Sequence, residues 1–124
     1  MNRPQQLQLE RVRITAFNAF QGERVARDLE TNEALWDGFV FGRFRLLELI
    51  ELRDLPSGYL NADTLYLSTT RERLQDLLRL AETWAGEVSW HANDYAGFAT
   101  REEFERQWGG SLEDEQVVVQ VWWD

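Results

Sequence analysis

The fold is decided by the stretch from Ala62 to His91, which reads ADTLYLSTTRERLQDLLRLAETWAGEVSWH. Residues 63–68 alternate apolar and polar side chains, as expected of a strand with one buried face, and residues 87–91 alternate in the same way. Between them, six apolar side chains recur at helical spacing and share one face: Leu74, Leu77, Leu78, Ala81, Trp84 and Ala85. The stretch therefore predicts a β-α-β unit whose strands run parallel with a right-handed crossover.

Both ends of this helix carry a local signal. Thr69 stands three residues before Glu72, the spacing of a capping box in which side chains satisfy free backbone N–H groups. Gly86 follows the apolar stripe and supplies the left-handed conformation that often ends a helix. The capping pattern recurs at Thr100–Glu103, which predicts a second, short helix ending at Gly109.

Outward from this unit the patterns are weaker. Leu7–Phe17 alternates with one slip in phase, which predicts a bulged strand. Residues 23–36 predict a helix that Asn32 interrupts. Phe39–Leu55 fits a long strand or a strand followed by a helix, and its aromatic content favours the long strand. A turn at residues 56–58 would fold this segment back onto the next strand as a hairpin.

These elements follow one another in the order β-α-β-β-α-β, then α-β, with a final strand at residues 116–123. The first six match the order of a ferredoxin-like α+β sandwich, to which a short helix and a C-terminal strand are added. A chain of 124 residues without internal repeats is expected to form a single α+β domain over residues 1–124.

Composition limits the classes of function. The net charge of −9 disfavours direct binding to nucleic acid, because phosphate backbones repel an acidic surface. No apolar run approaches the roughly 20 residues that span a bilayer, and the first residues lack a secretory signal. Cysteine is absent, so disulfides and thiolate-bound metals are unavailable. We therefore expect a cytoplasmic protein that does not bind membranes.

The negative charge is concentrated in the second half of the chain. Residues 1–62 hold 8 arginines and 9 acidic residues, and residues 63–124 hold 5 arginines and 13 acidic residues. This asymmetry predicts a patch that binds a basic protein surface, with these residues as its candidates: Glu102, Glu103, Glu105, Glu113, Asp114, Glu115 and Trp122. The carboxylates have a simpler interpretation, in which they complement a helix dipole and keep a linker solvated.

The favoured function is accordingly a small acidic protein-interaction module of the inhibitor, immunity-protein or nucleic-acid-mimic type. The alternative is a small-molecule-binding domain or minor enzyme with a site near His91, where Asp94 would orient the imidazole and Tyr95 would assist. A partly exposed histidine at a loop edge is the simpler explanation for His91. No catalytic motif and no cofactor or metal site is predicted.

The C-terminal strand raises the question of self-association. Residues 117–123 carry no charge and are mostly apolar. Such a strand at the edge of a sheet would pair with another copy, so it must be central, covered or part of a homodimer.

Overall fold

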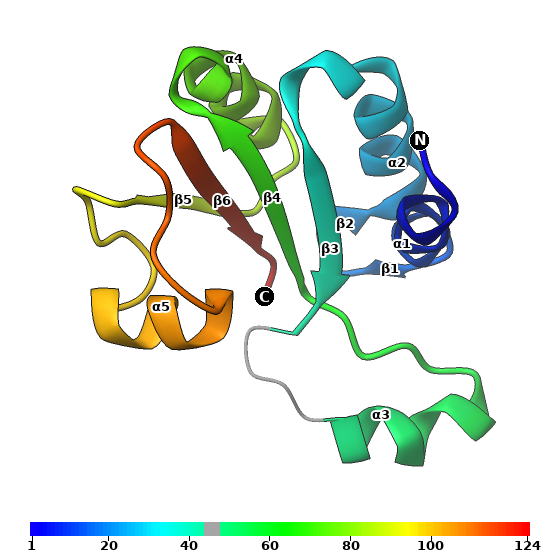
Figure 1. Ribbon diagram of the computed structural model, residues 1–124. Coiled ribbons are helices and arrows are strands. Elements are labelled where there is room, and N and C mark those ends of the chain that lie inside the picture. Colours follow the sequence, from blue (N-terminus) through cyan, green and yellow to red (C-terminus); the bar gives the residue numbers. More distant parts are fainter. Residues whose placement is uncertain (44–47) are drawn as a thin grey trace.

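A four-stranded antiparallel sheet organises the chain (Figure 1). The computed structural model describes residues 1–43 and 48–124. The sheet has the order β3-β4-β6-β5, and a separate hairpin pairs the two shortest strands. The strand bounds are β1 (Ala16–Phe17), β2 (Phe20–Gln21), β3 (Gly38–Gly42), β4 (Thr64–Thr70), β5 (Glu87–Ala92) and β6 (Gln116–Trp122).

Helices lie on both faces of this sheet, which makes the architecture α+β. The helices are α1 (Arg3–Arg13), α2 (Gly22–Thr31), α3 (Glu48–Asp54), α4 (Arg71–Glu82) and α5 (Arg101–Trp108), with 3-10 turns at Glu33–Leu35 and Leu55–Ser57. The main core packs α1, α2 and α4 against one face. On the other face α5 closes a smaller core, and α3 projects away from the sheet (Figure 1). Within the described residues, no helix is long and apolar enough to cross a membrane.

The central β-α-β unit is confirmed as β4, α4 and β5. Leu77 and Ala81 of α4 are fully buried against the sheet. The two strands both run antiparallel to β6, so they are parallel to each other as predicted. They are not neighbours, however, because β6 lies between them and pairs with both.

The predicted end signals of α4 are wrong in detail. The N-cap is Thr70, whose side chain makes no capping hydrogen bond. Thr69 instead donates from its hydroxyl to the Leu35 carbonyl at 2.7 Å, so it holds the preceding turn and not the helix. The left-handed residue at the other end is Ala85, with φ of 62°, and not Gly86.

Glycine is required at position 86 because β6 leaves no room there for a side chain. A Cβ at this position would lie 2.8 Å from Cγ1 of Val121 and 2.9 Å from the ring of Trp123. The backbone of Gly86 therefore approaches the inward face of β6 too closely for any side chain.

At the second predicted capping box the signal is confirmed in part, since the Thr100 hydroxyl accepts the Glu103 N–H at 3.2 Å and Gly109 ends α5 at φ of 87°.

The strand predicted at Leu7–Phe17 is wrong, because residues 3–13 form helix α1. Asn2 caps the helix by accepting the Gln5 N–H at 2.9 Å, and Pro4 stands in its first turn, where a missing N–H costs nothing. Leu9 and Val12, three residues apart, are its buried residues. The apparent slip in alternation was therefore helical periodicity.

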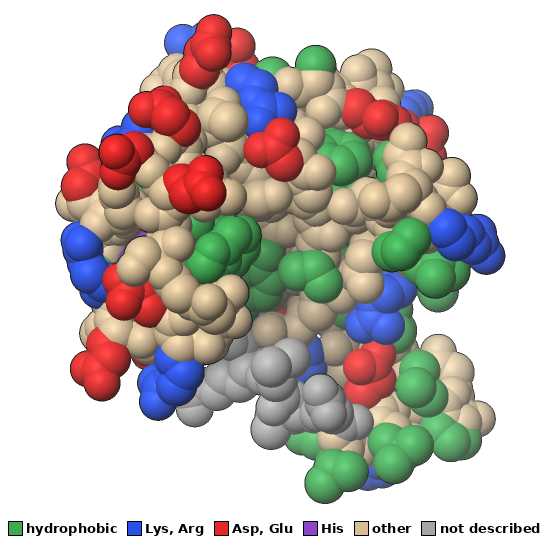
Figure 2. All heavy atoms as spheres, in the orientation of Figure 1, with side chains coloured by type: hydrophobic (Ala, Val, Ile, Leu, Met, Phe, Trp, Pro, Cys, Tyr) green, Lys and Arg blue, Asp and Glu red, His purple; other side chains and the backbone are tan. Residues whose placement is uncertain are grey.

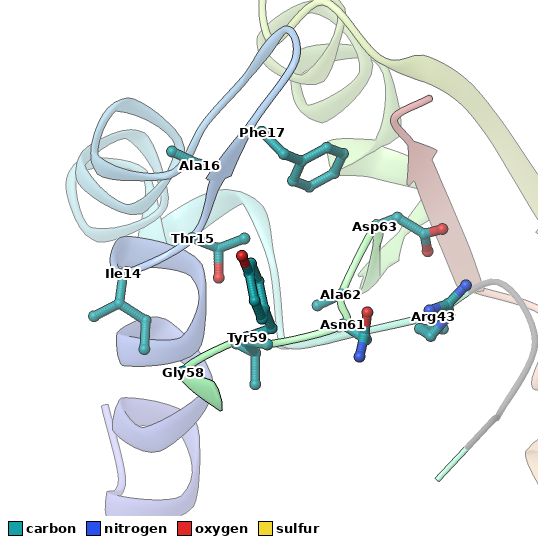
Figure 3. Close-up of a pocket in the computed structure, with 11 residues that line it drawn as sticks. Ile14, Thr15, Ala16, Phe17, Arg43, Gly58, Tyr59, Asn61, Ala62 and Asp63 are labelled. Atoms are coloured by element: carbon teal, nitrogen blue, oxygen red, sulfur yellow. The ribbon is translucent and has the colours of Figure 1, made fainter. Parts of the chain in front are cut away.

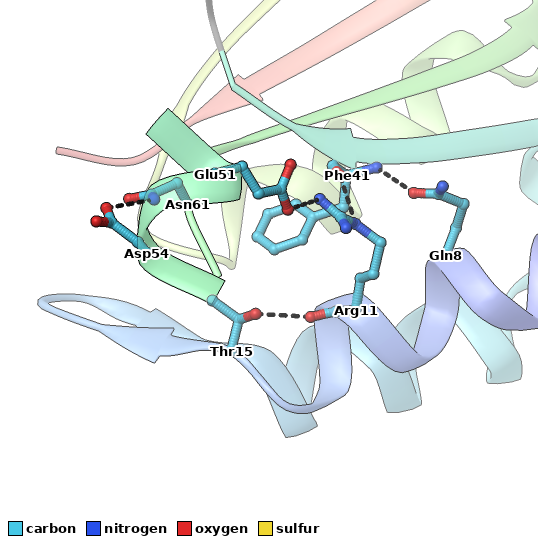
Figure 4. Close-up of polar contacts among 7 residues, drawn as sticks. All are labelled: Gln8, Arg11, Thr15, Phe41, Glu51, Asp54 and Asn61. Carbon is cyan, nitrogen blue, oxygen red and sulfur yellow. Dashed lines mark hydrogen bonds and ion pairs between the residues drawn. The ribbon is translucent and has the colours of Figure 1, made fainter. Parts of the chain in front are cut away.

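Polar side chains of α1 cover the outer edge of β3. Gln5 exchanges two hydrogen bonds with the backbone of Phe39, at 2.7 and 3.1 Å. Gln8 accepts the N–H of Phe41 at 2.9 Å, and Arg11 donates to its carbonyl at 3.2 Å (Figure 4). These side chains replace the neighbouring strand that an edge would otherwise recruit.

The predicted long strand at Phe39–Leu55 is also wrong. Its first part forms β3 and pairs antiparallel with β4, with Phe39 opposite Leu67, so the hairpin partners are confirmed. Residues 48–54 form α3 instead, and residues 44–47 lie outside the described part of the chain. The helix predicted at 23–36 forms up to Thr31, and Asn32 caps its C-terminus.

The ferredoxin-like arrangement is not confirmed. A helix stands where its first strand was predicted, and the sheet order is β3-β4-β6-β5. The final strand forms as predicted, with Val119, Val121 and Trp123 in the main core and Val118 in the smaller core on the other face. It occupies a central place in the sheet, where both edges of β6 are hydrogen-bonded. A homodimer that pairs through this strand therefore has no free edge to use.

Candidate functional site

The predicted carboxylates lie on α5 and on the connector that joins it to β6. We call them the acidic surface: Glu102, Glu103, Glu105, Glu113, Asp114 and Glu115. All are exposed except Glu105, which is half-buried. Figure 2 shows most acidic side chains of this face over α4, α5 and the connector, with arginines among them.

Arginines neutralise carboxylates mainly in the first half of the chain. The described residues contain seven ion pairs, and in five of them the carboxylate belongs to residues 1–62. None of the seven involves the acidic surface, although Arg101 and Arg106 stand on α5 itself. The uneven charge of the sequence is thus kept in the folded molecule.

Arg71, the first residue of α4, holds the connector in place. Its Nε donates to the carbonyl oxygen of Asp114 at 2.7 Å, and its Nη2 donates to Asn93 at 2.9 Å and to Asp94 at 2.5 Å. Asn93 in turn donates to the Asp114 carboxylate at 2.7 Å. The backbone of the connector is therefore fixed, while the side chains of Glu113 and Glu115 point into solvent.

The residues proposed to assist His91 are engaged elsewhere. The hydrogen bond and charge of Arg71 hold the pKa of Asp94 below its ordinary value, so Asp94 is committed to α4. Tyr95 stacks on Trp90, with ring centroids 4.2 Å apart. The structure therefore does not bring Asp94 and Tyr95 together around the imidazole.

His91 itself belongs to the smaller core. It is 2% exposed, and its ring stacks on Phe104 at 4.0 Å and 6°. Its Nδ1 accepts the backbone N–H of Gly97 at 3.2 Å. Burial lowers the pKa of His91, Arg101 lowers it further, and Glu105 partly offsets both. The imidazole of His91 is therefore buried and packs as an aromatic ring of the smaller core.

Trp122 lies away from the other predicted partner-binding residues. It is at the end of β6 opposite the connector, and six residues of strand at about 3.3 Å each separate the two by about 20 Å. Trp122 is half-buried and lines a pocket of about 360 Å³ with Glu87, Val88, Ser89 and Gln120. These residues could not be grouped from the sequence, because the pairing of β5 with β6 is not visible in it.

Figure 3 shows a second cavity, of about 420 Å³, between the end of α1 and residues 58–63. The rings of Phe17 and Tyr59 line it, and the side chains of Arg43 and Asp63 lie toward its other end. These residues come from three separate segments without a shared motif. Sequence reasoning therefore missed this cavity.

Hydrogen bonds around the cavity attach α3 to the rest of the molecule (Figure 4). Arg11 pairs with Glu51 of α3 at 3.2 Å, while its own carbonyl accepts the Thr15 hydroxyl at 2.6 Å. Asn61 donates to Asp54 at 2.8 Å. Hydrogen bonds from Arg53 and from Asn61 lower the pKa of Asp54 to about 2.

Helix α3 presents apolar side chains to solvent. Leu49 is 79% exposed and Leu52, one turn further, is 65% exposed. Leu55 and Tyr59, just beyond the helix, are exposed as well. A contiguous apolar surface of this kind on a charged protein commonly marks an interaction site.

The described residues contain no group of three or more acidic or histidine side chains that could hold a metal ion. No family model, curated protein or solved structure matches this chain. The chemistry of its own surfaces is therefore the basis for a function.

Proposed function

We propose that this chain is a small protein-interaction module that binds the basic surface of another protein through its acidic surface. The observation that carries the proposal is the set of exposed carboxylates on α5 and the connector that form no ion pair within the described residues. Inhibitors, immunity proteins and nucleic-acid mimics share this charge character.

The connector gives the stronger support. Glu102 and Glu103 stand in the first turn of α5, where each stabilises the helix dipole by about 0.3–1 kcal/mol, so their presence has a structural explanation. Glu113, Asp114 and Glu115 stand outside any helix, and the connector lies beside Arg71 at the start of α4, whose charge acts on Asp114 and Glu115. None of the three carboxylates forms an ion pair within the described residues. A field of this kind speeds association with a cationic partner and rejects anionic ones.

Exposed hydrophobic side chains supply binding energy that surface charge alone does not. Trp108, at the end of α5, is 43% exposed and lies on the same helix as three of the carboxylates. Tryptophans are enriched among the residues that dominate binding energy, and charged residues more often set partner choice and rate.

The test compares two variants of equal charge. One replaces Glu102, Glu103, Glu113 and Glu115 by Gln. The matched control replaces four exposed glutamates elsewhere that form no ion pair with any residue the structure describes: Glu23, Glu33, Glu72 and Glu82. Glu23 and Glu72 also stand in first helical turns, so dipole effects are balanced between the two variants.

Each immobilised protein is exposed to an extract of the native host at 50 mM and at 300 mM salt. We expect the wild type and the control to retain the same basic protein at low salt, and the acidic-surface variant to lose most of it. Retention should fall with salt because screening shortens the reach of surface charges to about 10 Å near 0.1 M. Equal loss from both variants would show that only net charge matters, and would refute the proposal.

A further inference from the structure

The pocket beside Trp122 lies on the face of the sheet that α5 covers only in part. The register places three cross-strand pairs of β5 and β6 on this face: His91–Val118, Ser89–Gln120 and Glu87–Trp122. Phe104 of α5 packs on the first pair. The other two pairs line the pocket of about 360 Å³ and lie beyond the helix.

Gln120 is the unusual residue of this pocket. It occupies the middle of a central strand and is only 5% exposed. Its side-chain Oε1 is buried, and none of the described residues donates a hydrogen bond to it. Buried polar groups are nearly always paired, so an unpaired acceptor on a residue that lines a pocket indicates a missing donor.

The surrounding side chains indicate what kind of donor is missing. Glu87 is exposed at the entrance and forms no ion pair in the described part of the chain, and Ser89 adds a half-buried hydroxyl. Trp122 offers a half-buried indole ring. A carboxylate, a neutral acceptor and an aromatic face in one small pocket suit a cation that carries several N–H donors on an apolar stem.

We propose that this pocket receives an arginine side chain of the basic partner protein, an inference that rests on the proposed function. The guanidinium stacks on Trp122 and pairs with Glu87, while its methylene stem fills the apolar part of the pocket. The Gln120 amide turns about its last side-chain bond, so that Oε1, buried in the unbound protein, accepts from the guanidinium. The net charge of −9 favours a cationic occupant. The volume lies at the lower end of the range of ligand sites, which suits a single side chain.

The test uses N-acetyl-L-arginine amide as a probe and its neutral isostere, N-acetyl-L-citrulline amide, as the comparison. Binding is followed by the shift of the indole N–H signal of Trp122 in nitrogen-15 NMR spectra, assigned with the Trp122→Phe variant. We expect saturable binding of the arginine probe, at least tenfold tighter than that of the citrulline probe.

Two variants and one control locate the interaction. Glu87→Gln should weaken the arginine probe about tenfold and leave the citrulline probe unchanged, and Gln120→Leu should abolish the binding of both. The control, Glu82→Gln, removes one exposed carboxylate from α4, on the opposite face of the sheet, and should change nothing. Equal affinity for the two probes, no shift of the Trp122 signal, or equal effects of Glu87→Gln and Glu82→Gln would each overturn the proposal.

The two proposals fail in distinguishable ways. If the wild type and Gln120→Leu retain the basic partner equally well and the probe does not bind, the arginine pocket is refuted and the proposed function stands. If the probe binds as described but the acidic-surface variant retains the partner as well as its control does, the proposed function is refuted and the pocket stands.

Discussion

Two glutamines on the same strand should respond in opposite ways to the same substitution. Gln120 carries a buried Oε1 for which the described part of the chain supplies no donor, whereas Oε1 of Gln116 accepts the backbone N–H of Glu113 at 2.9 Å. Replacement of either residue by Leu keeps the side-chain size and removes the amide. The comparison therefore isolates the cost of an unpaired acceptor from the value of a satisfied one.

The expected magnitudes follow from this difference. A buried polar group without a partner costs about 1–3 kcal/mol of folding free energy. Gln120→Leu should therefore raise the free energy of unfolding by about 1–2 kcal/mol, which is about 4 °C in Tm per kcal/mol for a domain of this size. Gln116→Leu should lower it by about 0.5–1.5 kcal/mol, because it removes one hydrogen bond.

Urea denaturation measures both changes, with tryptophan fluorescence as the signal and equal m-values as the test that the unfolding transition is unchanged. A loss of stability in Gln120→Leu equal to that in Gln116→Leu would refute the reasoning. It would mean that Oε1 of Gln120 is satisfied in solution by bound water, and that the pocket offers no free acceptor. A gain in stability together with lost binding would mark Gln120 as a residue kept for function at the expense of stability.

Three further substitutions test the fold around the site. Gly86→Ala should lower the free energy of unfolding by about 1–3 kcal/mol, because its Cβ would lie 2.9 Å from the ring of Trp123, whereas Gly42→Ala has open space and should cost far less. Burial lowers the pKa of His91 in the folded protein, so the unfolded chain binds the proton more readily, and the wild type should lose stability in urea denaturation as pH falls below about 6.5. His91→Phe should remove this loss of stability. Thr100→Ala should cost about 1 kcal/mol in the same assay, because it removes the side chain that caps α5.

Each of these has a result that would contradict it. Equal losses in the two glycine variants would show that close approach is not the reason for the glycine before β5. Parallel stability curves for wild type and the histidine variant between pH 6.5 and 5, above the range in which most carboxylates titrate, would show that the imidazole is not held neutral. An unchanged urea midpoint for Thr100→Ala would mean that packing alone, and not the capping hydrogen bond, stabilises α5.

The sequence predicted those elements whose periodicity is undisturbed. The patterns of β4, β5 and β6 and the apolar stripe on α4 correctly predicted three strands and a helix. Helix α1 was missed because Leu7 and Leu9 suggest alternation, although Asn2 and Pro4 are signals of a helix start. The apolar stripe of α1 is also interrupted by Gln5 and Gln8, which face β3 and hydrogen-bond to the backbone at its edge although they are polar.

The candidate site was predictable only where residues adjoin in the chain. The acidic surface could be found because its members fall within two short segments. Asp94 is close to His91 in sequence, yet Arg71, which is more than twenty residues away, determines where its carboxylate points. The pocket at Trp122 could not be found, since it depends on the insertion of β6 between β4 and β5, a long-range pairing that no local pattern encodes.

The incomplete covering of the second sheet face connects these observations. A domain that only had to fold would place apolar residues along a central strand and cover them, as α5 does over Val118. Beyond the helix, β6 instead carries Gln120 and then Trp122, and neither belongs to a core cluster of the described residues. Within the described residues, the carboxylates of α5 and of the connector beside this face also form no ion pair with an arginine. Both features cost the isolated protein stability, and a basic partner that supplies donors and positive charge would relieve both at once.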